Sequence, residues 1–456
     1  MQTLSIDNTQ SPKRLPRELN LKSFQLGLIA IFFFALVLRI GAIASLESWK
    51  YPNPMEHRGV ALALLRGDGF SFNEFNHYGP SSVQSPPYPL LLASLFSIFG
   101  PDSAGAYTAA MIINAFAGAL SCVVTGLLAQ RLGASFLISL VGAALVAIWP
   151  TQVYAVTVAQ AISLITLCTV CVMWLFYVSV DTQRILPWLG YSLIGCLGAL
   201  TEPVLLPFMA LSGLLILFWP KLAWSIRLRN AAILFLSALL VIGPWSYRNY
   251  RVHGKFVPVK NTVWVNIWKG ANPHATGTDR LPMTDEMREQ LKTMTDAQKR
   301  DATFDSARQY DKLTEEQLRA LNKQPEIVRE QLFHDWAVSW IKANPKQWAQ
   351  LCVARLGKTL WIEWDNPKGE QFYFISRTIL LAASAVGFVF AFFHRWRMLI
   401  PILVMGTGVL TYTLTIAAAR FAFPYEPWQL ILASLAIIAL ATKFGLFEEP
   451  PAPANL

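Results

Sequence analysis

Glu56 is the residue of this chain whose type and position best suit acid–base chemistry. It begins the run Glu56–Phe70, in which apolar residues recur at helical spacing and Gly67 and Gly69 supply a helix stop. The pattern predicts a short amphipathic helix that starts with a carboxylate, and such a group can act as a general base on a hydroxyl or an amine. The alternative is an acid at a helix N-terminus that is merely favoured by the helix dipole, worth less than ~1 kcal/mol.

His57 follows Glu56 and could assist proton transfer or bind a metal ion, although a polar surface pair is the simpler interpretation. The other histidines show no ligand spacing. The one CxxC, Cys168 with Cys171, lies inside a continuous apolar run and is interpreted as packing. We therefore predict no metal site and no disulfide framework.

The elements that must position these residues belong to a membrane protein. Of the 456 residues, 54% are hydrophobic and 14% are charged, whereas soluble proteins carry roughly 25% charged residues. This composition excludes a disordered chain and disfavours a soluble globule. In a membrane protein, the net charge of +10 reflects basic cytoplasmic loops and anionic head groups, so nucleic acid is not expected as a partner.

Ten apolar segments predict membrane spans. They are Phe24–Leu46, Ala104–Gln130, Ala134–Trp149, Val153–Val180, Leu186–Leu200, Val204–Phe218, Ala231–Trp245, Tyr373–Phe393, Met398–Ala419 and Trp428–Thr442. With this threading every basic short loop lies on the side of the basic N-terminal tail, which the positive-inside rule assigns to the cytoplasm together with the C-terminus. The predicted fold class is mainly α, a polytopic transmembrane helical bundle with a helical extracytoplasmic insert.

Two large outer regions follow from this topology, Glu47–Asp102 and Tyr250–Phe372. In the first, Pro86–Phe99 is expected to be an interfacial or re-entrant helix, and the second contains a polar helical stretch, Met283–Trp348. The expected organisation is a cytoplasmic tail (1–23), a transmembrane module (24–249) with first outer loop 47–102, an extracytoplasmic helical region (250–372), C-terminal transmembrane helices (373–445) and a flexible tail (446–456). Before residue 250, six acids fall on the outer face: Glu47, Glu56, Asp68, Glu74, Asp102 and Glu202.

Four groups of residues carry a resemblance to a known family. They are Leu64–Ser71 with Ser85–Leu92, which follow Glu56; Gly243–Tyr250 with His253–Val259; Asn266–Pro273; and Ala419–Phe421 with Pro424–Pro427. In order and in outer-face placement they resemble the GT-C glycosyltransferases. The closest branch is family 39, which includes protein mannosyltransferases and the aminoarabinose transferase of lipid A. The resemblance covers about residues 24–440.

The resemblance implies an enzyme of the plasma (inner) membrane that moves a sugar from a polyprenyl-phosphate donor to a lipid, glycan or protein acceptor on the extracytoplasmic face. No cofactor is implied beyond that lipid-linked donor. Glu56 is the best match to the family's first-loop catalytic acid. Arg248 and Arg420 match arginines of the family pattern and are assigned to phosphate binding, with Lys269 and Lys255 as weaker candidates. Arg248 could instead be a snorkelling arginine, and Arg420 could pair with Glu426.

Two positions depart from the family pattern. Gln160 stands where the family often has a second acid, and Glu202-Pro203 stands where an arginine commonly precedes proline. Glu202 either pairs with an outer-face arginine or supplies the missing acid; the plainer alternative is a loop acid at the water interface.

Two other functions stay open at this point. Ten spans would also suit a transporter or flippase for a lipid-linked saccharide, and the departures at Gln160 and Glu202 would suit a catalytically silent relative that binds glycolipid. The cytoplasmic side shows no glycine-rich nucleotide loop, which argues against a nucleotide-sugar donor and against an ATP-driven pump.

Overall fold

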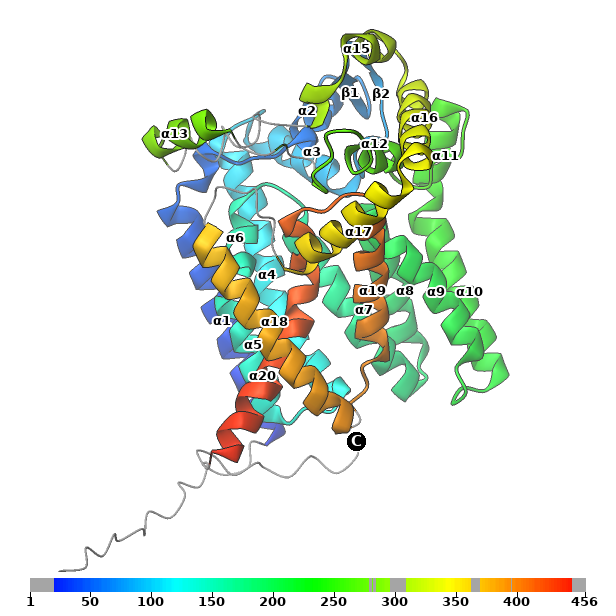
Figure 1. Cartoon of the computed structure of the whole chain (residues 1–456). Coiled ribbons are helices and arrows are strands. Elements are labelled where there is room, and N and C mark those ends of the chain that lie inside the picture. Colours follow the sequence, from blue (N-terminus) through cyan, green and yellow to red (C-terminus); the bar gives the residue numbers. More distant parts are fainter. Residues whose placement is uncertain are drawn as a thin grey trace, which may run out of the picture.

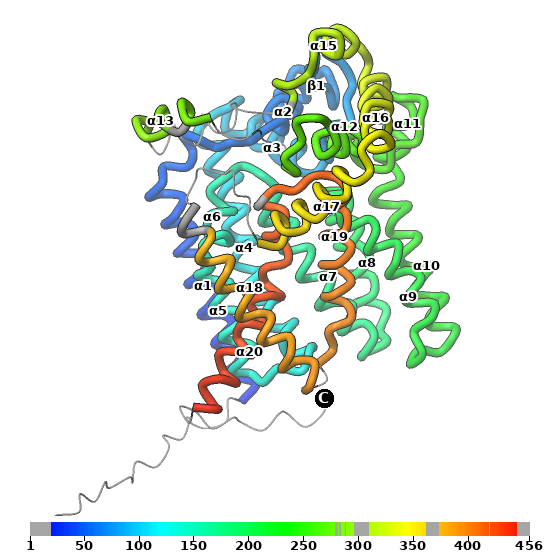
Figure 2. Tube along the Cα trace, in the orientation of Figure 1, coloured from blue at the N-terminus to red at the C-terminus, as the bar shows by residue number. Residues whose placement is uncertain are grey.

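The computed structural model describes residues 20–278, 281, 284–295, 309–361, 370–394 and 396–444. Within them the chain forms a bundle of long apolar helices, and a cap of shorter helices and one β-hairpin covers one end of the bundle (Figure 1). The Cα trace shows that residues from both halves of the chain contribute to the cap (Figure 2). The predicted flexible tail 446–456, most of the tail 1–23 and part of Met283–Trp348 lie outside the described residues.

Ten helices build the bundle in the part of the chain that the structure describes: α1 (Leu21–Ser45), α4 (Ala104–Leu132), α5 (Phe136–Ile148), α7 (Ile162–Thr182), α8 (Ile185–Thr201), α9 (Leu206–Phe218), α10 (Trp224–Val241), α18 (Glu370–Phe393), α19 (Leu399–Leu414) and α20 (Glu426–Lys443). Among the described residues, six helical segments are long and apolar enough to cross a membrane: α1, α4, α7, α10, Phe374–Phe393 and Arg420–Lys443. The chain is therefore a multi-pass membrane protein.

The predicted number of ten spans is not confirmed and stays a prediction. A bent pair, α5 with α6 (Pro150–Tyr154) and η2 (Ala155–Thr157), makes one further candidate span. Four shorter apolar helical segments are α3 (Pro87–Phe99), α8, η3 (Pro203–Leu205) with α9, and α19. The expected span Val153–Val180 begins instead at Ile162, because Val158–Ala161 leave the helix and Ala159 N–H donates to Pro52 O. The expected span Ala231–Trp245 is divided between α10 and α11 (Gly243–His253), with Pro244 in the first turn of α11.

Short polar side chains and glycine set the ends of several bundle helices. Asn20, Ser103 and Ser135 accept hydrogen bonds from backbone N–H groups in the first turns of α1, α4 and α5. Gly133 ends α4 with φ +119°, a conformation that favours glycine. These caps satisfy backbone groups that would otherwise be orphaned at the helix ends.

The cap contains α2 (Glu56–Leu65), the hairpin β1 (Ser71–Glu74) and β2 (His77–Pro80), α3 (Pro87–Phe99), α11, α12 (Val263–Lys269), α13 (Asp285–Thr293), η4 (Gln309–Lys312), α15 (Glu315–Leu321), α16 (Glu326–Ala343) and α17 (Pro345–Leu360). A small core joins α12, α15 and α16 and includes Val265, Trp268, Leu321, Phe333 and Ala337. Because the first outer loop and the second outer region share the cap, residues far apart in sequence come together there.

The short helix predicted after Glu56 is present as α2, and Glu56 is its first residue. Gly67 and Gly69 follow its C-terminus with φ +82° and +69°, which explains why the helix stops there. The predicted helix Pro86–Phe99 is present as α3 and packs against α2 and α4.

A buried ion pair joins two bundle helices at the start of α20. Arg377 of α18 and Glu426 of α20 meet at 2.8 Å, with side chains 1% and 0% exposed. Glu426 also accepts hydrogen bonds from Thr151 and from Gln152, while Arg377 donates to Leu360 O. The pair therefore ties α18 and α20 to α6. Glu426 directly follows the 3₁₀ turn η5 (Ala419–Tyr425), so the pair also secures this turn.

We expect Glu426→Ala to destabilise the protein by about 3–5 kcal/mol, because it leaves the Arg377 guanidinium buried without its charge partner. Replacing both residues, as in Arg377→Met with Glu426→Met, should recover part of this loss. Glu47→Ala is the control, since Glu47 pairs with Lys50 at an exposed site and should change stability by about 1 kcal/mol at most. Thermal unfolding of the purified proteins in one detergent measures all three, and equal melting temperatures for the two single variants would contradict the expectation.

Candidate functional site

A cavity of about 250 Å³ lies between the bundle and the cap. Its wall is contributed by α2, β1, the start of α7, the end of α8, the loop before α12, α12 itself, α16 and η5. Its charged and titratable lining residues are Glu56, His57, Glu74, Glu202, Lys260, Lys269, Tyr310, Glu326, Arg329, Glu330, Tyr412 and Arg420. Of the eight site residues expected from the sequence, six line this one cavity: Glu56, His57, Gln160, Glu202, Lys269 and Arg420.

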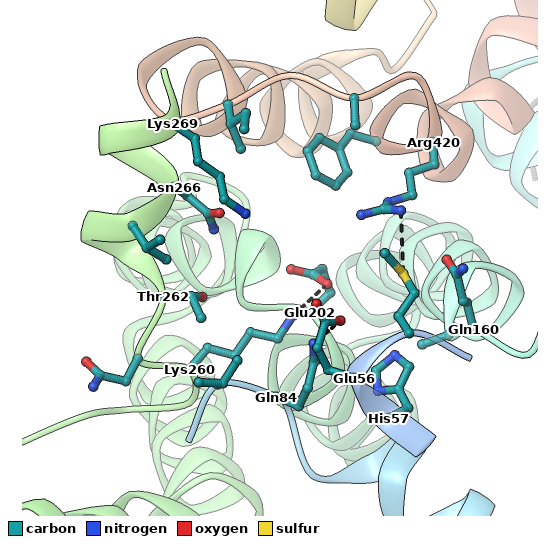
Figure 3. Close-up of a pocket in the computed structure, with 18 of the residues that line it drawn as sticks. Glu56, His57, Gln84, Gln160, Glu202, Lys260, Thr262, Asn266, Lys269 and Arg420 are labelled. Carbon is teal, nitrogen blue, oxygen red and sulfur yellow. Dashed lines mark hydrogen bonds and ion pairs between the residues drawn. The ribbon is translucent and has the colours of Figure 1, made fainter. Parts of the chain in front are cut away.

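Glu56 faces the cavity from the first turn of α2 and accepts a hydrogen bond from Gln84 Nε2 at 3.1 Å (Figure 3). The backbone before it is strained, since Asn53 and Met55 have φ +45° and +51°, which is unfavourable for residues other than glycine. Gln160 Nε2 donates to Asn53 O at 2.9 Å. Gln160 therefore helps to hold the strained segment that presents the carboxylate.

Besides Arg329, which pairs with Glu74, three cations reach the cavity from different elements: Arg420, Lys260 and Lys269 (Figure 3). Arg420 extends from η5, and its guanidinium lies 3.5 Å from Sδ of Met55. Lys260 comes from the loop before α12 and pairs with Glu202 at 3.3 Å. Lys269, in the last turn of α12, lies 4.7 Å from the ring centroid of Tyr310. We expected an arginine as a possible partner of Glu202, and the structure shows a lysine, Lys260. The alternative pairing of Arg420 with Glu426 is wrong, because Glu426 pairs with Arg377.

His57 is held as the neutral imidazole. Burial, together with the positive charges of Lys260 and Arg420, lowers the pKa of His57 to about 3. A histidine with this pKa is not a proton donor near neutral pH. The same electrostatic effect indicates that Lys260 and Arg420 both lie near the residue that follows Glu56. The carboxylate and the two cations therefore converge on one region.

Arg248, like the exposed Lys255, is an expected site residue that does not line the cavity. Its guanidinium donates to Ser81 O at 2.6 Å and to Phe70 O at 2.8 Å, and it lies over the Trp245 ring at 4.9 Å. It also donates to Asn249 Oδ1. Because these acceptors come from the protein itself, the geometry gives Arg248 a structural role in place of the expected phosphate contact. These specific hydrogen bonds also argue against the alternative that Arg248 is a snorkelling arginine.

The other outer-face acids divide into two groups. Glu47, Asp68 and Asp102 pair with Lys50, Arg66 and Arg58 at exposed or partly exposed positions, and none lines the cavity. Glu74 does line it, and its carboxylate pairs with Arg329 at 2.8 Å. Burial raises the pKa of Glu74, although Arg329 and Lys269 oppose the shift.

Sequence reasoning missed Lys260 and two acids of α16, Glu326 and Glu330. Glu326 is 5% exposed and accepts from Ser81 Oγ and Ser82 N. Glu330 accepts from the N–H groups of Trp264 and Val265 at the start of α12. Their spacing of four residues puts both acids on one helix face, and this was the available signal. It was obscured because the whole stretch is rich in charge.

Among the described residues, no three His, Cys, Asp or Glu side chains gather as a group that could hold a metal ion. The chemistry that the cavity offers comes from its carboxylates, amides and cations. Apolar residues complete the wall where the bundle helices contribute to it: Ile162, Ile165, Tyr412, Ile416 and Phe421.

No family model matches this chain, and no curated protein matches its sequence. Among solved structures, it is similar to ArnT from Cupriavidus metallidurans bound to undecaprenyl phosphate, with 12% identity and a TM-score of 0.38 over 93% of this chain and 80% of that chain. The apo state of the same ArnT gives 11% identity and a TM-score of 0.33 over 90% and 79%. Because these values are low, the functional inferences below are drawn from the residues of this chain.

Glu330 makes the stability of the cap depend on pH. Burial raises its pKa from 4.5 to about 7, so between these pH values the folded protein keeps a proton that the unfolded chain has released. The contribution of Glu330 to the free energy of unfolding is therefore most favourable below pH 4.5 and falls as the pH rises to about 7. We expect Glu330→Gln to reduce this fall, on the order of 1–3 kcal/mol.

Melting temperatures of the purified protein between pH 4.5 and 8 measure this effect. Glu289→Gln serves as the matched control, because Glu289 is an exposed helical acid on α13 and should leave the pH dependence unchanged. A Glu330→Gln variant with the same pH dependence as the unsubstituted protein would contradict the expectation.

Proposed function

We propose that this protein is an integral-membrane glycosyltransferase that moves a sugar from a polyprenyl-phosphate donor to a glycan, lipid or protein acceptor. The observation that carries the proposal is the convergence of Glu56 with Arg420 and Lys269 in a single cavity that is also lined by apolar residues of the bundle. The motifs that resemble GT-C glycosyltransferases, and family 39 among them, support it independently, since they contribute Glu56, Lys269 and Arg420.

In the proposed reaction, Glu56 is the general base. Its carboxylate takes the proton of the acceptor hydroxyl or amine, whose oxygen or nitrogen attacks the anomeric carbon of the donor sugar. The bond between that carbon and the phosphate oxygen breaks, and polyprenyl phosphate leaves with the bonding electron pair. Negative charge grows on the phosphate during this step, and fixed cations at that position stabilise the transition state. Arg420 and Lys269 are proposed for this role.

The apolar part of the wall suits the lipid portion of such a donor. Ile162 and Ile165 of α7 and Ile416, just after α19, line the cavity on the side of the bundle. A donor bound here would keep its phosphate at the charged end and its first isoprene units against apolar side chains. This arrangement separates charge from hydrocarbon at the membrane edge, where both are accommodated at low cost.

The proposed orientation places the cavity on the extracytoplasmic face of the plasma (inner) membrane and the termini in the cytoplasm. It is supported by a cluster of basic residues at the C-terminal end of α7, the helix whose first residues line the cavity. Asp181 at the end of α7 pairs with Arg131 at 3.4 Å and with Arg397 at 2.7 Å, and Arg229 donates to Gln183 O. Basic residues concentrated at one end of a bundle are typical of the cytoplasmic side.

The test is substitution of the proposed base. We expect Glu56→Gln to lower sugar transfer at least ~100-fold, since general base catalysis typically contributes 10²–10⁴-fold, while binding of the lipid donor is retained. Glu56→Asp should keep a larger part of the activity than Glu56→Gln. Glu47→Gln is the control, because Glu47 belongs to the same loop but lies outside the cavity.

The assay uses purified protein in liposomes, radiolabelled sugar on polyprenyl phosphate and a panel of acceptors, and it follows product formation. Equal transfer by the unsubstituted protein and Glu56→Gln would refute the role of Glu56. Movement of intact sugar-lipid across the liposome membrane without transfer would instead identify a flippase, which is the alternative function considered from the sequence.

A further inference from the structure

The loop that delivers Lys260 to the cavity is held by an unusually dense set of hydrogen bonds. Asn249 Nδ2 donates to Val257 O at 3.0 Å and to Val259 O at 3.1 Å. Trp245 Nε1 also donates to Val259 O, and Ser246 Oγ donates to Pro258 O. Val257 and Val259 are buried, whereas Lys260 is turned toward the cavity. The position of the lysine is thus set by its backbone.

The residue at the centre of these bonds is itself fixed. Asn249 is fully buried, and its Oδ1 accepts from Ser82 Oγ and from Arg248 Nη1. Ser82 O in turn accepts from Asn261 N at 2.9 Å. Buried polar groups are costly unless they are hydrogen-bonded, and here nearly all of them serve one loop. The hydrogen bonds of this loop thus place the ammonium group of Lys260 in the cavity.

The partner of Lys260 is suited to exchange. Glu202 lies directly after α8, the distance between its Oε2 and Lys260 Nζ is 3.3 Å, and the two side chains remain 36% and 18% exposed. Solvent reaches both side chains of this pair and screens the attraction between their charges. A ligand anion that reaches the ammonium can therefore replace the carboxylate at a small cost.

The surroundings of the pair favour an anion. Arg420 also lines the cavity, and among the described residues its guanidinium has only the thioether of Met55 as a hydrogen-bond acceptor. The charges of both Lys260 and Arg420 act on His57. Arg420 and Lys260 thus both lie near the imidazole of His57, which follows Glu56 in sequence. Arg420 has a weak acceptor, Met55 Sδ, and Lys260 has a partly exposed carboxylate, Glu202.

We propose that Lys260 is a phosphate-binding residue and that Glu202 is its resting counter-ion, which the phosphate of the lipid donor displaces. The proposal rests on the proposed function. Before binding, Glu202 neutralises Lys260. After binding, the ammonium contacts the phosphate and Glu202 turns to solvent. Transfer of the sugar converts a phosphodiester with one negative charge to a phosphomonoester with up to two, so Lys260 interacts more strongly as the reaction proceeds.

The test measures binding of undecaprenyl phosphate to the purified full-length protein in detergent, with uncharged undecaprenol as the comparison ligand. We expect Lys260→Met to weaken binding of undecaprenyl phosphate about tenfold or more, because a charge-assisted contact is lost. Binding of undecaprenol should be unchanged. Lys260→Arg should stay within about threefold of the unsubstituted protein, since it keeps the charge. Lys255→Met is the matched control, as Lys255 is an exposed lysine of the same loop.

The variant Glu202→Gln distinguishes two roles of Glu202: a counter-ion that phosphate displaces from Lys260, and one half of a structural salt bridge. If Glu202 competes with phosphate, this variant binds undecaprenyl phosphate more tightly than the unsubstituted protein; if the pair only holds the fold, it binds more weakly, as Lys260→Met does. This second measurement also decides the matter if Lys260→Met fails to fold. Unchanged phosphate binding by Lys260→Met overturns the role of Lys260 and leaves the proposed function standing. Failure of the unsubstituted protein to bind undecaprenyl phosphate overturns both.

Discussion

The structure depends on one constraint, that a charge inside an apolar bundle must have a partner. Arg39 of α1 is fully buried and donates to Val146 O and Ala147 O at the end of α5. Arg377 and Glu426 satisfy each other between α18 and α20. The first contact joins α1 to α5, and the second joins α18 to α20 and, through Thr151 and Gln152, to α6. Gln152 also donates to Phe423 O in the turn that carries Arg420. Burial of an unpaired ion costs several kcal/mol, so the polar contacts restrict how the apolar helices can pack.

The cavity applies the same constraint in a weaker form. Its deeper acids are fully engaged, Glu326 with two serines and Glu330 with the start of α12. Toward the bundle the hydrogen-bond and charge partners become weaker: a partly exposed carboxylate, Glu202, for Lys260 and the thioether of Met55 for Arg420. The charged groups with several strong hydrogen bonds, Glu326 and Glu330, thus support the wall of the cavity. The charged groups with weaker partners, Lys260 and Arg420, are the ones available to a ligand.

Local signals predicted α2 well, because Glu56, the helical spacing and the two glycines all lie within fifteen residues. The apolar runs predicted the bundle, but not where its helices break; Val158–Ala161 leave the helix through a contact of Ala159 with Pro52, about a hundred residues away. Lys260 could not be recognised, since its position depends on Asn249 and Ser82 rather than on its neighbours. Arg248 was assigned to phosphate for the same reason, as a sequence does not show that carbonyl groups already occupy a guanidinium.

The place of α20 has a consequence for how the protein is made. This helix is the last of the chain among the described residues, yet it is largely buried, packed against α4, α5 and α18. Arg39 and Arg377 are synthesised before Glu426 and Arg420, so the Arg377 guanidinium has no carboxylate partner and the cavity has no Arg420 until the segment from η5 to α20 has been made. A nascent chain cut short before η5 therefore carries the proposed base, Glu56, without Arg420 as one of the cations of the cavity.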